Sequence, residues 1–208
     1  LSHGNADLTP TEIQQLASVE LARDVVALRG DSTVQIVGFD LAGAEKGFPA
    51  SDYSEAFALV GKGLLGKTVH AGEADGPSSV RVAVEQLGAT RIGHGVRSIE
   101  DDRVVEMLVD RGTLLEVCPT SNVHTQVTPS IREHPLPRLI ERGVSVCLST
   151  DDPGISNITL TGEYELVQET FGLSRADLAL MNVRAARYAF AGSEQRAALM
   201  ECLGDSAS

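Results

Sequence analysis

Short apolar runs bounded by turn residues recur along the chain and predict five β-strands. All but the third run are apolar or β-branched through their middles, which is typical of strands buried on both faces. The predicted strands are residues 34–40, 67–71, 91–94, 114–118 and 144–150.

The segments between these runs carry apolar residues at helical spacing, and three of the predicted helices begin with a capping box. Residues 9–12 (Thr-Pro-Thr-Glu) open the first helix, which Gly30 is expected to end. Residues 98–101 and 174–177 open two others, and Gly112 closes the earlier of the two. The chain is therefore predicted to alternate between strand and helix.

This alternation predicts a parallel sheet, because each right-handed crossover returns the chain to the same end of the sheet. Two architectures fit: an open doubly wound sheet and a closed (β/α)8 barrel. The open sheet usually has a G-x-G-x-x-G turn after its first strand, and residues 43–47 do not match that pattern. The barrel is favoured because its active sites lie at the carboxyl ends of the strands, where four of the five runs place acid–base or metal-ligand side chains. These side chains are Asp40, His70 with Glu73, His94, and Asp151 with Asp152.

The chain is short for such a barrel. A (β/α)8 barrel takes about 250 residues, whereas 208 residues with five predicted strands are present. No internal repeat, linker or compositional shift divides the sequence. We therefore expect residues 1–208 to form a single α/β domain, an incomplete (β/α)8 TIM-type barrel.

Composition and charge narrow the class of partner. The chain is 42% hydrophobic and carries a net charge of −12, a field that repels phosphate backbones and anionic lipid. We therefore expect a small-molecule partner rather than nucleic acid or membrane. Three cysteines (Cys118, Cys147 and Cys202) make no disulfide framework, and the first residues lack a signal-peptide pattern. A soluble, cytoplasmic protein is the expectation.

Two of the strand ends carry histidine in a setting that suits metal chemistry. His70 and Glu73 flank a tight turn, and a carboxylate beside a zinc-bound histidine can carry a proton without binding the metal. His94 stands between two glycines, which allow close approach of the backbone. Taken alone, each motif also fits a structural histidine of the core. In that interpretation Glu73 is an ordinary solvent-exposed carboxylate.

The last predicted strand ends in adjacent carboxylates. Asp151 and Asp152 point in different directions, so that one can bind a metal while its neighbour faces the substrate. The same pair also fits an ordinary helix cap before Pro153. A metal-dependent hydrolase needs imidazole, carboxylate ligand and proton carrier together, and their occurrence at successive strand ends favours that class.

Five ordered motifs resemble the adenosine deaminases of the amidohydrolase superfamily, and together they cover nearly the whole chain. The motifs are Phe-Asp-Leu-Ala-Gly at 39–43, Thr-Val-His-Ala-Gly-Glu at 68–73, Arg-Ile-Gly-His-Gly at 91–95, Glu-Val-Cys-Pro-Thr-Ser-Asn at 116–122 and Ser-Thr-Asp-Asp-Pro at 149–153.

The resemblance implies zinc-dependent hydrolytic deamination of adenosine and 2′-deoxyadenosine to inosine and ammonia, by attack of water on C6 of the purine. Zn²⁺ would be bound by His70 and Asp151. Glu73 would protonate N1, and His94 would orient and help deprotonate the attacking water. Asp152 would hydrogen-bond N7. The resemblance further implies that the backbone N–H of Gly43 meets N3.

The sequence departs from the family at its beginning. The family's first strand supplies a His-x-His pair as further zinc ligands, and these 208 residues contain no His-x-His. His3 resembles the end of the third strand, so the chain is expected to be the C-terminal part, from the end of strand three through strand eight. Its missing N-terminal segment then becomes an expected partner. Cys118 and Asn122 are expected to be strand-end structure, and His124 and His134 surface or helix residues.

Two alternatives stay open. One is the deamination of another 6-aminopurine, adenine or aminodeoxyfutalosine, although the aminodeoxyfutalosine enzymes resemble this chain less, since Val69 and Gly93 replace the proline and arginine of their pattern. The other is a truncated, non-catalytic chain.

Overall fold

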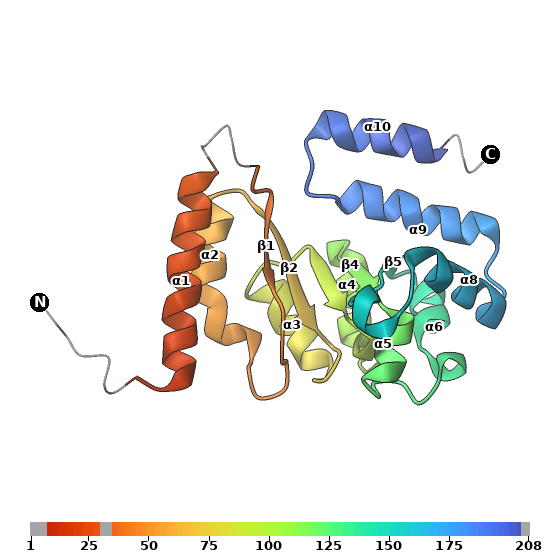
Figure 1. Cartoon of the computed structure of the whole chain (residues 1–208), viewed down its shortest axis with the longest axis horizontal. Coiled ribbons are helices and arrows are strands. Elements are labelled where there is room, and N and C mark those ends of the chain that lie inside the picture. Colours follow the sequence, from red (N-terminus) through yellow and green to blue (C-terminus); the bar gives the residue numbers. More distant parts are fainter. Residues whose placement is uncertain (1–7, 30–34, 205–208) are drawn as a thin grey trace, which may run out of the picture.

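The computed structural model describes residues 8–29 and 35–204. Within these ranges five parallel strands form one sheet, in the order in which they follow one another along the chain (Figure 1). The strands are β1 (Gly38–Leu41), β2 (Gly66–Ala71), β3 (Arg91–His94), β4 (Leu114–Val117) and β5 (Ser145–Leu148). All five predicted strands are confirmed. The predicted start of the first, at residue 34, lies outside the described residues, β1 begins at Gly38, and the other strand ends shift by up to two residues.

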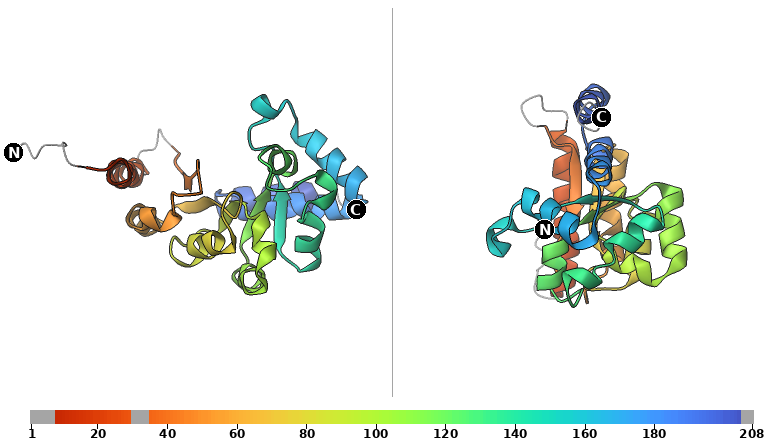
Figure 2. Two further views of the ribbon diagram at one scale, coloured as in Figure 1. Left: turned by 90° about the horizontal axis from the view of Figure 1, so that it is seen from below. Right: turned by 90° about the vertical axis from the view of Figure 1, so that its right-hand side faces the viewer.

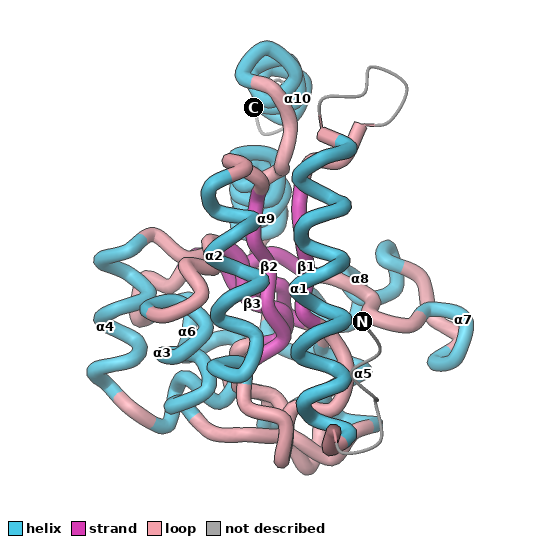
Figure 3. The backbone as a smooth tube through the Cα atoms, turned by 90° about the vertical axis from the view of Figure 1, so that its left-hand side faces the viewer, coloured by secondary structure: helices cyan, strands magenta, loops and turns pink. Residues whose placement is uncertain are grey.

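Helices connect the strands and surround the sheet, which lies at the centre of the molecule (Figure 3). The α-helices are α1 (Pro10–Leu28), α2 (Ser54–Lys62), α3 (Pro77–Glu85), α4 (Asp102–Arg111), α5 (Pro119–His124), α6 (Leu136–Glu141), α7 (Pro153–Ser156), α8 (Leu160–Phe171), α9 (Arg175–Tyr188) and α10 (Ser193–Gly204). Short 3-10 helices are η1 (Ala50–Tyr53), η2 (Val96–Glu100) and η3 (Ile131–Glu133). Helix α1 packs along α2 at the β1 end of the sheet, and α9 packs on β5 and β4 (Figures 1 and 2).

This arrangement is part of a (β/α)8 barrel, because consecutive parallel strands are neighbours and helices cross between them. The core is formed by fully buried side chains such as Ile92 and Leu115 on the strands and Phe57 and Leu108 on the helices. No helix among the described residues is long and apolar enough to span a membrane.

Two of the three predicted capping boxes are confirmed. Thr9 and Ser174 each accept a hydrogen bond from the third residue of their helix, whose carboxylate accepts one in return. The third prediction is wrong, because Ser98 lies within η2 and donates its hydroxyl to the Gly95 carbonyl. Asp101 caps α4 instead. The strand end predicted at His3 and the stop at Gly30 lie outside the described residues.

The parallel register brings every carboxyl end to one edge of the sheet. His70 pairs with Gly93, and Ala71 pairs with His94, so the two histidines leave adjacent strands one residue apart in register. One layer below, Arg91 forms an ion pair with Glu116 at 2.7 Å and lies over the ring of Phe190. This polar layer lies on the same face of the sheet as His70, because side chains alternate along a strand.

Candidate active site

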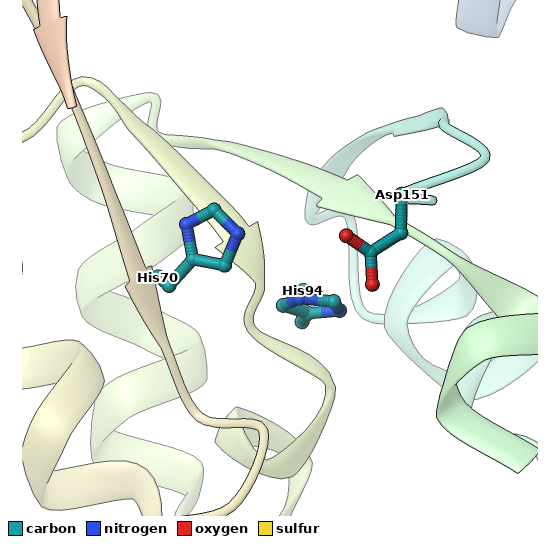
Figure 4. Close-up of side chains that lie close together, drawn as sticks. All are labelled: His70, His94 and Asp151. Atoms are coloured by element: carbon teal, nitrogen blue, oxygen red, sulfur yellow. The ribbon is translucent and has the colours of Figure 1, made fainter. Parts of the chain in front are cut away.

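Three potential metal ligands converge at the carboxyl edge of the sheet. His70 lies on β2, His94 ends β3, and Asp151 follows β5, with one ligand atom of each lying within 4.8 Å of those of the other two (Figure 4). His94 is buried, His70 is partly buried and Asp151 is exposed. Residues separated by up to 81 positions therefore meet because parallel crossovers return the chain to the same edge.

The backbone of this site is unusual at two of the three residues. His94 has φ 62° and Asp151 has φ 58°, the left-handed region that residues with a Cβ seldom adopt. Such conformations are costly and concentrate at functional sites. Gly93 adds a close approach, because a Cβ there would lie 3.1 Å from Nδ1 of His70. A side chain at Gly93 would therefore crowd the ring of His70.

His70 lies close to a carboxylate that is not one of the three potential ligands. Its Nδ1 lies 3.7 Å from Oδ1 of Asp40, which raises the pKa of His70, while burial acts in the opposite direction. This Nδ1 is buried and makes no hydrogen bond. Metal-binding histidines commonly pair their second nitrogen with a carboxylate, which orients the ring. Two imidazoles and a carboxylate, one imidazole backed by Asp40, are a donor set that fits zinc.

Glu73 lies beside this group. Its Oε2 is 3.6 Å from Nε2 of His94, and its Oε1 accepts a hydrogen bond of 3.1 Å from the hydroxyl of Thr125. Burial lowers the pKa of His94, and the charge of Glu73 opposes this effect. A carboxylate and an imidazole thus lie side by side next to the potential metal ligands, the combination that general acid–base chemistry requires.

The sequence reasoning missed Glu45, which holds the loop that carries Glu73. The Glu45 carboxylate accepts backbone N–H bonds from Gly72 at 2.6 Å and from Glu73 and Asp75 at 3.0 Å each, and it also accepts the Ser79 hydroxyl. Burial raises the pKa of Glu45, but these hydrogen bonds outweigh it and lower the pKa overall. The signal available in the sequence was its position two residues after the 39–43 motif.

Replacement of Glu45 by Gln should loosen this loop. The amide turns a donor group toward the backbone N–H groups and removes the charge, so the free energy of unfolding should fall by about 2 kcal/mol. Urea unfolding measures this change. The exposed Glu106→Gln on α4 is the matched control, expected to stay within about 0.5 kcal/mol of the original. Equal stability of the two variants would show that the Glu45 carboxylate does not hold this loop.

The remaining predicted site residues lie nearby but make fewer contacts. Asp151 accepts a 2.7 Å hydrogen bond from the hydroxyl of Ser121. Asp152 is exposed at the start of α7 and makes no capping hydrogen bond with its side chain. Gly43 has φ 114° and lines, together with His70 and residues of α1 and η1, a cavity of about 380 Å³. That volume is within the range of small-molecule sites.

The sequence reasoning assigned a role in the site neither to Asn122, expected as strand-end structure, nor to His134. Asn122 is fully buried in α5, where its Nδ2 lies 3.2 Å from Nδ1 of His94 and its Oδ1 lies 3.2 Å from Nε2 of His134. The expectation of a surface or helix position is wrong for His134, which follows η3 and is 3% exposed, because both nitrogens of its ring are engaged by the buried Asn122 and by the backbone of Leu136. His124 is exposed in α5, as expected. Cys118 lies buried between β4 and α5, a strand-end position as expected.

The burial of His134 predicts a pH dependence of stability. Burial lowers its pKa from 6.5 to about 4, so the unfolded chain takes up a proton over this pH range before the folded chain does. Stability is then lost as the pH falls from 6.5 toward 4, by about 3 kcal/mol. Unfolding free energies at both ends of the range measure this loss. The loss should be smaller in His134→Gln and unchanged in the exposed His124→Gln; identical pH profiles for all three proteins would contradict it.

Five consecutive parallel strands, with metal-ligand and acid–base side chains at their carboxyl edge, define the class: part of a (β/α)8 barrel whose site lies at the carboxyl face. The family model described as adenosine deaminase matches residues 11–206, and the chain belongs to that family.

Curated relatives carry two different names. An adenine deaminase of Rhizobium leguminosarum bv. trifolii is 46% identical over 165 residues, which are 79% of this chain and 51% of the relative. An adenosine deaminase of Shewanella loihica is 44% identical over 164 residues, or 79% of this chain and 50% of the relative. The chain spans about half the length of the curated relatives it matches.

Solved structures show the same relationship. The adenine deaminase of Arthrobacter aurescens superposes with a TM-score of 0.86 at 28% identity, over 94% of this chain and 59% of that protein. Arabidopsis ADAL complexed with IMP gives a TM-score of 0.82 at 25% identity, over 93% of this chain and 55% of ADAL. At least one relative therefore binds a purine nucleotide.

Proposed function

We propose that this chain forms part of a zinc-dependent deaminase that hydrolyses the 6-amino group of adenosine and 2′-deoxyadenosine, releasing inosine or deoxyinosine and ammonia. The observation that carries the proposal is the meeting of His70, His94 and Asp151 within 4.8 Å at the carboxyl edge of a partial barrel. Glu73 stands beside them, 3.6 Å from His94.

His70 and Asp151 would hold the zinc ion. When bound, zinc supplies a Lewis acid that lowers the pKa of water and so provides a nucleophile near neutral pH. The chain's own residues prepare these two ligands: Asp40 faces the second nitrogen of His70, and Ser121 donates to Asp151. Such neighbours orient ligands and raise metal affinity.

The proton traffic would fall to Glu73 and His94. A protonated Glu73 carboxyl donates to N1 of the purine, which withdraws electrons from C6 and makes it open to attack. Thr125 and the loop held by Glu45 fix the direction of that carboxyl. His94 orients the attacking water on the side facing C6, and its burial keeps competing water away.

Two further residues would hold the purine ring. Asp152 would bind N7, and the backbone N–H of Gly43 would bind N3, at the rim of the cavity that Gly43 and His70 line. Both contacts read atoms of the purine and not of the sugar. The ring contacts proposed here therefore serve adenosine and adenine equally well.

His70 and Asp151 alone are too few ligands for a catalytic zinc site. Catalytic zinc sites use three protein ligands, and the His-x-His pair of the family is absent from the 208 residues. We propose that a segment outside these residues, from the same polypeptide or another, supplies the remaining ligands and strands.

Adenine is the second candidate substrate, favoured by the relative named adenine deaminase at 46% identity. The fall in ultraviolet absorbance on loss of the 6-amino group measures both reactions. The zinc-loaded chain is assayed alone and mixed with the N-terminal half of the Shewanella loihica relative, with adenosine and with adenine. Turnover of either purine in the mixture supports the proposal, and the faster substrate decides between the two. A zinc-loaded mixture that forms a complex yet deaminates neither purine contradicts it.

A further inference from the structure

A buried chain of hydrogen bonds runs from the backbone at the start of α6 to the ring of His94. The N–H of Leu136 donates to Nδ1 of His134 at 3.1 Å. Nε2 of His134 lies 3.2 Å from Oδ1 of Asn122, and Nδ2 of Asn122 lies 3.2 Å from Nδ1 of His94. Asn122 is fully buried, and the two histidines are 3% and 2% exposed, so that water does not compete for these atoms.

The first bond of this chain fixes the direction of all the others. A backbone N–H can only donate, so Nδ1 of His134 must accept and carries no proton. His134 is neutral at pH 7, because burial lowers its pKa to about 4. A neutral imidazole without a proton on Nδ1 carries it on Nε2, and this N–H donates to Oδ1 of Asn122. The amide nitrogen of Asn122 then faces Nδ1 of His94 and donates to it.

The opposite orientation of the Asn122 amide is disfavoured. It would bring the amide NH₂ against the Nε2–H of His134, two donors face to face in a site closed to solvent. A buried donor without an acceptor costs about 1–3 kcal/mol. The amide therefore has one favourable orientation, set from the backbone of α6.

We infer that Asn122 and His134 are positioning residues that hold neutral His94 in the tautomer with its proton on Nε2. In this tautomer the nitrogen that faces Glu73, 3.6 Å from Oε2, is a donor. In the sequence, Asn122 can be singled out by its place in the 116–122 motif. Nothing in the sequence links it to His134.

The tautomer also decides what His94 can do to the attacking water, a point that rests on the proposed function. A neutral His94 with its lone pair on Nδ1 holds the attacking water by donating to it and offers no acceptor on the reacting side. Glu73 is then the neighbouring group that can accept a proton from the water as a carboxylate, and the carboxyl formed in this way donates that proton to N1 of the purine. Under this proposal His94 orients the water and Glu73 removes its proton.

The tautomer is measured by ¹⁵N NMR of the 208-residue chain labelled in histidine, with a chelator present and at a pH well above the ordinary histidine pKa. His94 is assigned by the signal lost in His94→Gln. The expected spectrum has the proton of His94 on Nε2 and an unprotonated Nδ1. A protonated Nδ1 in the original chain overturns the inference, whatever the variants do.

Asn122→Asp tests whether Asn122 sets this state. The carboxylate has nearly the shape of the amide but accepts from both histidines, so it should move the proton of His94 to Nδ1. Asn157→Asp, an exposed residue of left-handed backbone after α7, adds the same charge and should leave the tautomer unchanged. An unmoved proton in a folded Asn122→Asp chain overturns the role of Asn122. If that variant does not fold, Asn122→Leu decides: loss of the Nε2–H preference supports the role, and its retention overturns it. The measurement needs neither zinc nor turnover, so a failed deaminase assay does not affect it.

Discussion

Glu73→Gln is expected to lower turnover of the deaminated purine by about 10²–10⁴-fold, the usual contribution of a general acid or base. The amide keeps the size of the side chain and can still accept the hydroxyl of Thr125. It cannot deliver a proton to N1, so C6 stays a poor electrophile. The loss should fall on kcat, because binding of the purine depends on other contacts.

Zinc content and stability separate this loss from damage to the site. Both should stay close to those of the original protein, since Glu73 is not one of the converging ligand atoms. Glu106→Gln, exposed on α4, is the control for the substitution itself. Near-normal turnover in Glu73→Gln would remove Glu73 from the proposed chemistry.

Asp151→Ala is expected to weaken zinc binding by at least about 100-fold, because losing neighbours of a ligand alone already costs 10–100-fold. The substitution removes one of three ligand atoms that lie within 4.8 Å of one another. It also leaves the hydroxyl of Ser121 without its acceptor. Competition with a coloured zinc chelator measures the affinity.

The neighbouring carboxylate provides the matched control. Asp152→Ala removes the same charge one residue away and should keep zinc affinity, while weakening the binding of the purine. An Asp152→Ala variant that loses zinc, beside an Asp151→Ala variant that keeps it, would show that the two carboxylates had been assigned in the wrong order.

The strands and their common edge could be predicted because both follow from local pattern and from one rule of chain geometry. Apolar runs gave β1 to β5, and parallel crossovers required residues such as His70 and Asp151 to share an edge. Ser98 shows the limit of local pattern. The sequence at 98–101 matches a capping box, but Ser98 lies within η2, and Asp101 caps α4 instead.

The residues around the site could not be found in the same way. His134 lies in a polar stretch, and its burial depends on α5 and the segment before α6 meeting in space. Its partner Asn122 is 28 positions from His94, with an intervening strand. Glu45 precedes the loop it holds by 27 to 30 positions. Hydrogen bonds between distant segments leave no periodic trace in a sequence, so only the structure reveals them.

Diffraction from crystals of the chain soaked in Zn²⁺, measured on both sides of the zinc absorption edge, tests most directly whether these side chains gather one ion. We expect a single strong anomalous peak with a nitrogen of His70 and an oxygen of Asp151 about 2.0–2.2 Å away. A zinc ion bound elsewhere, with His70 and Asp151 pointing away from each other, would contradict it.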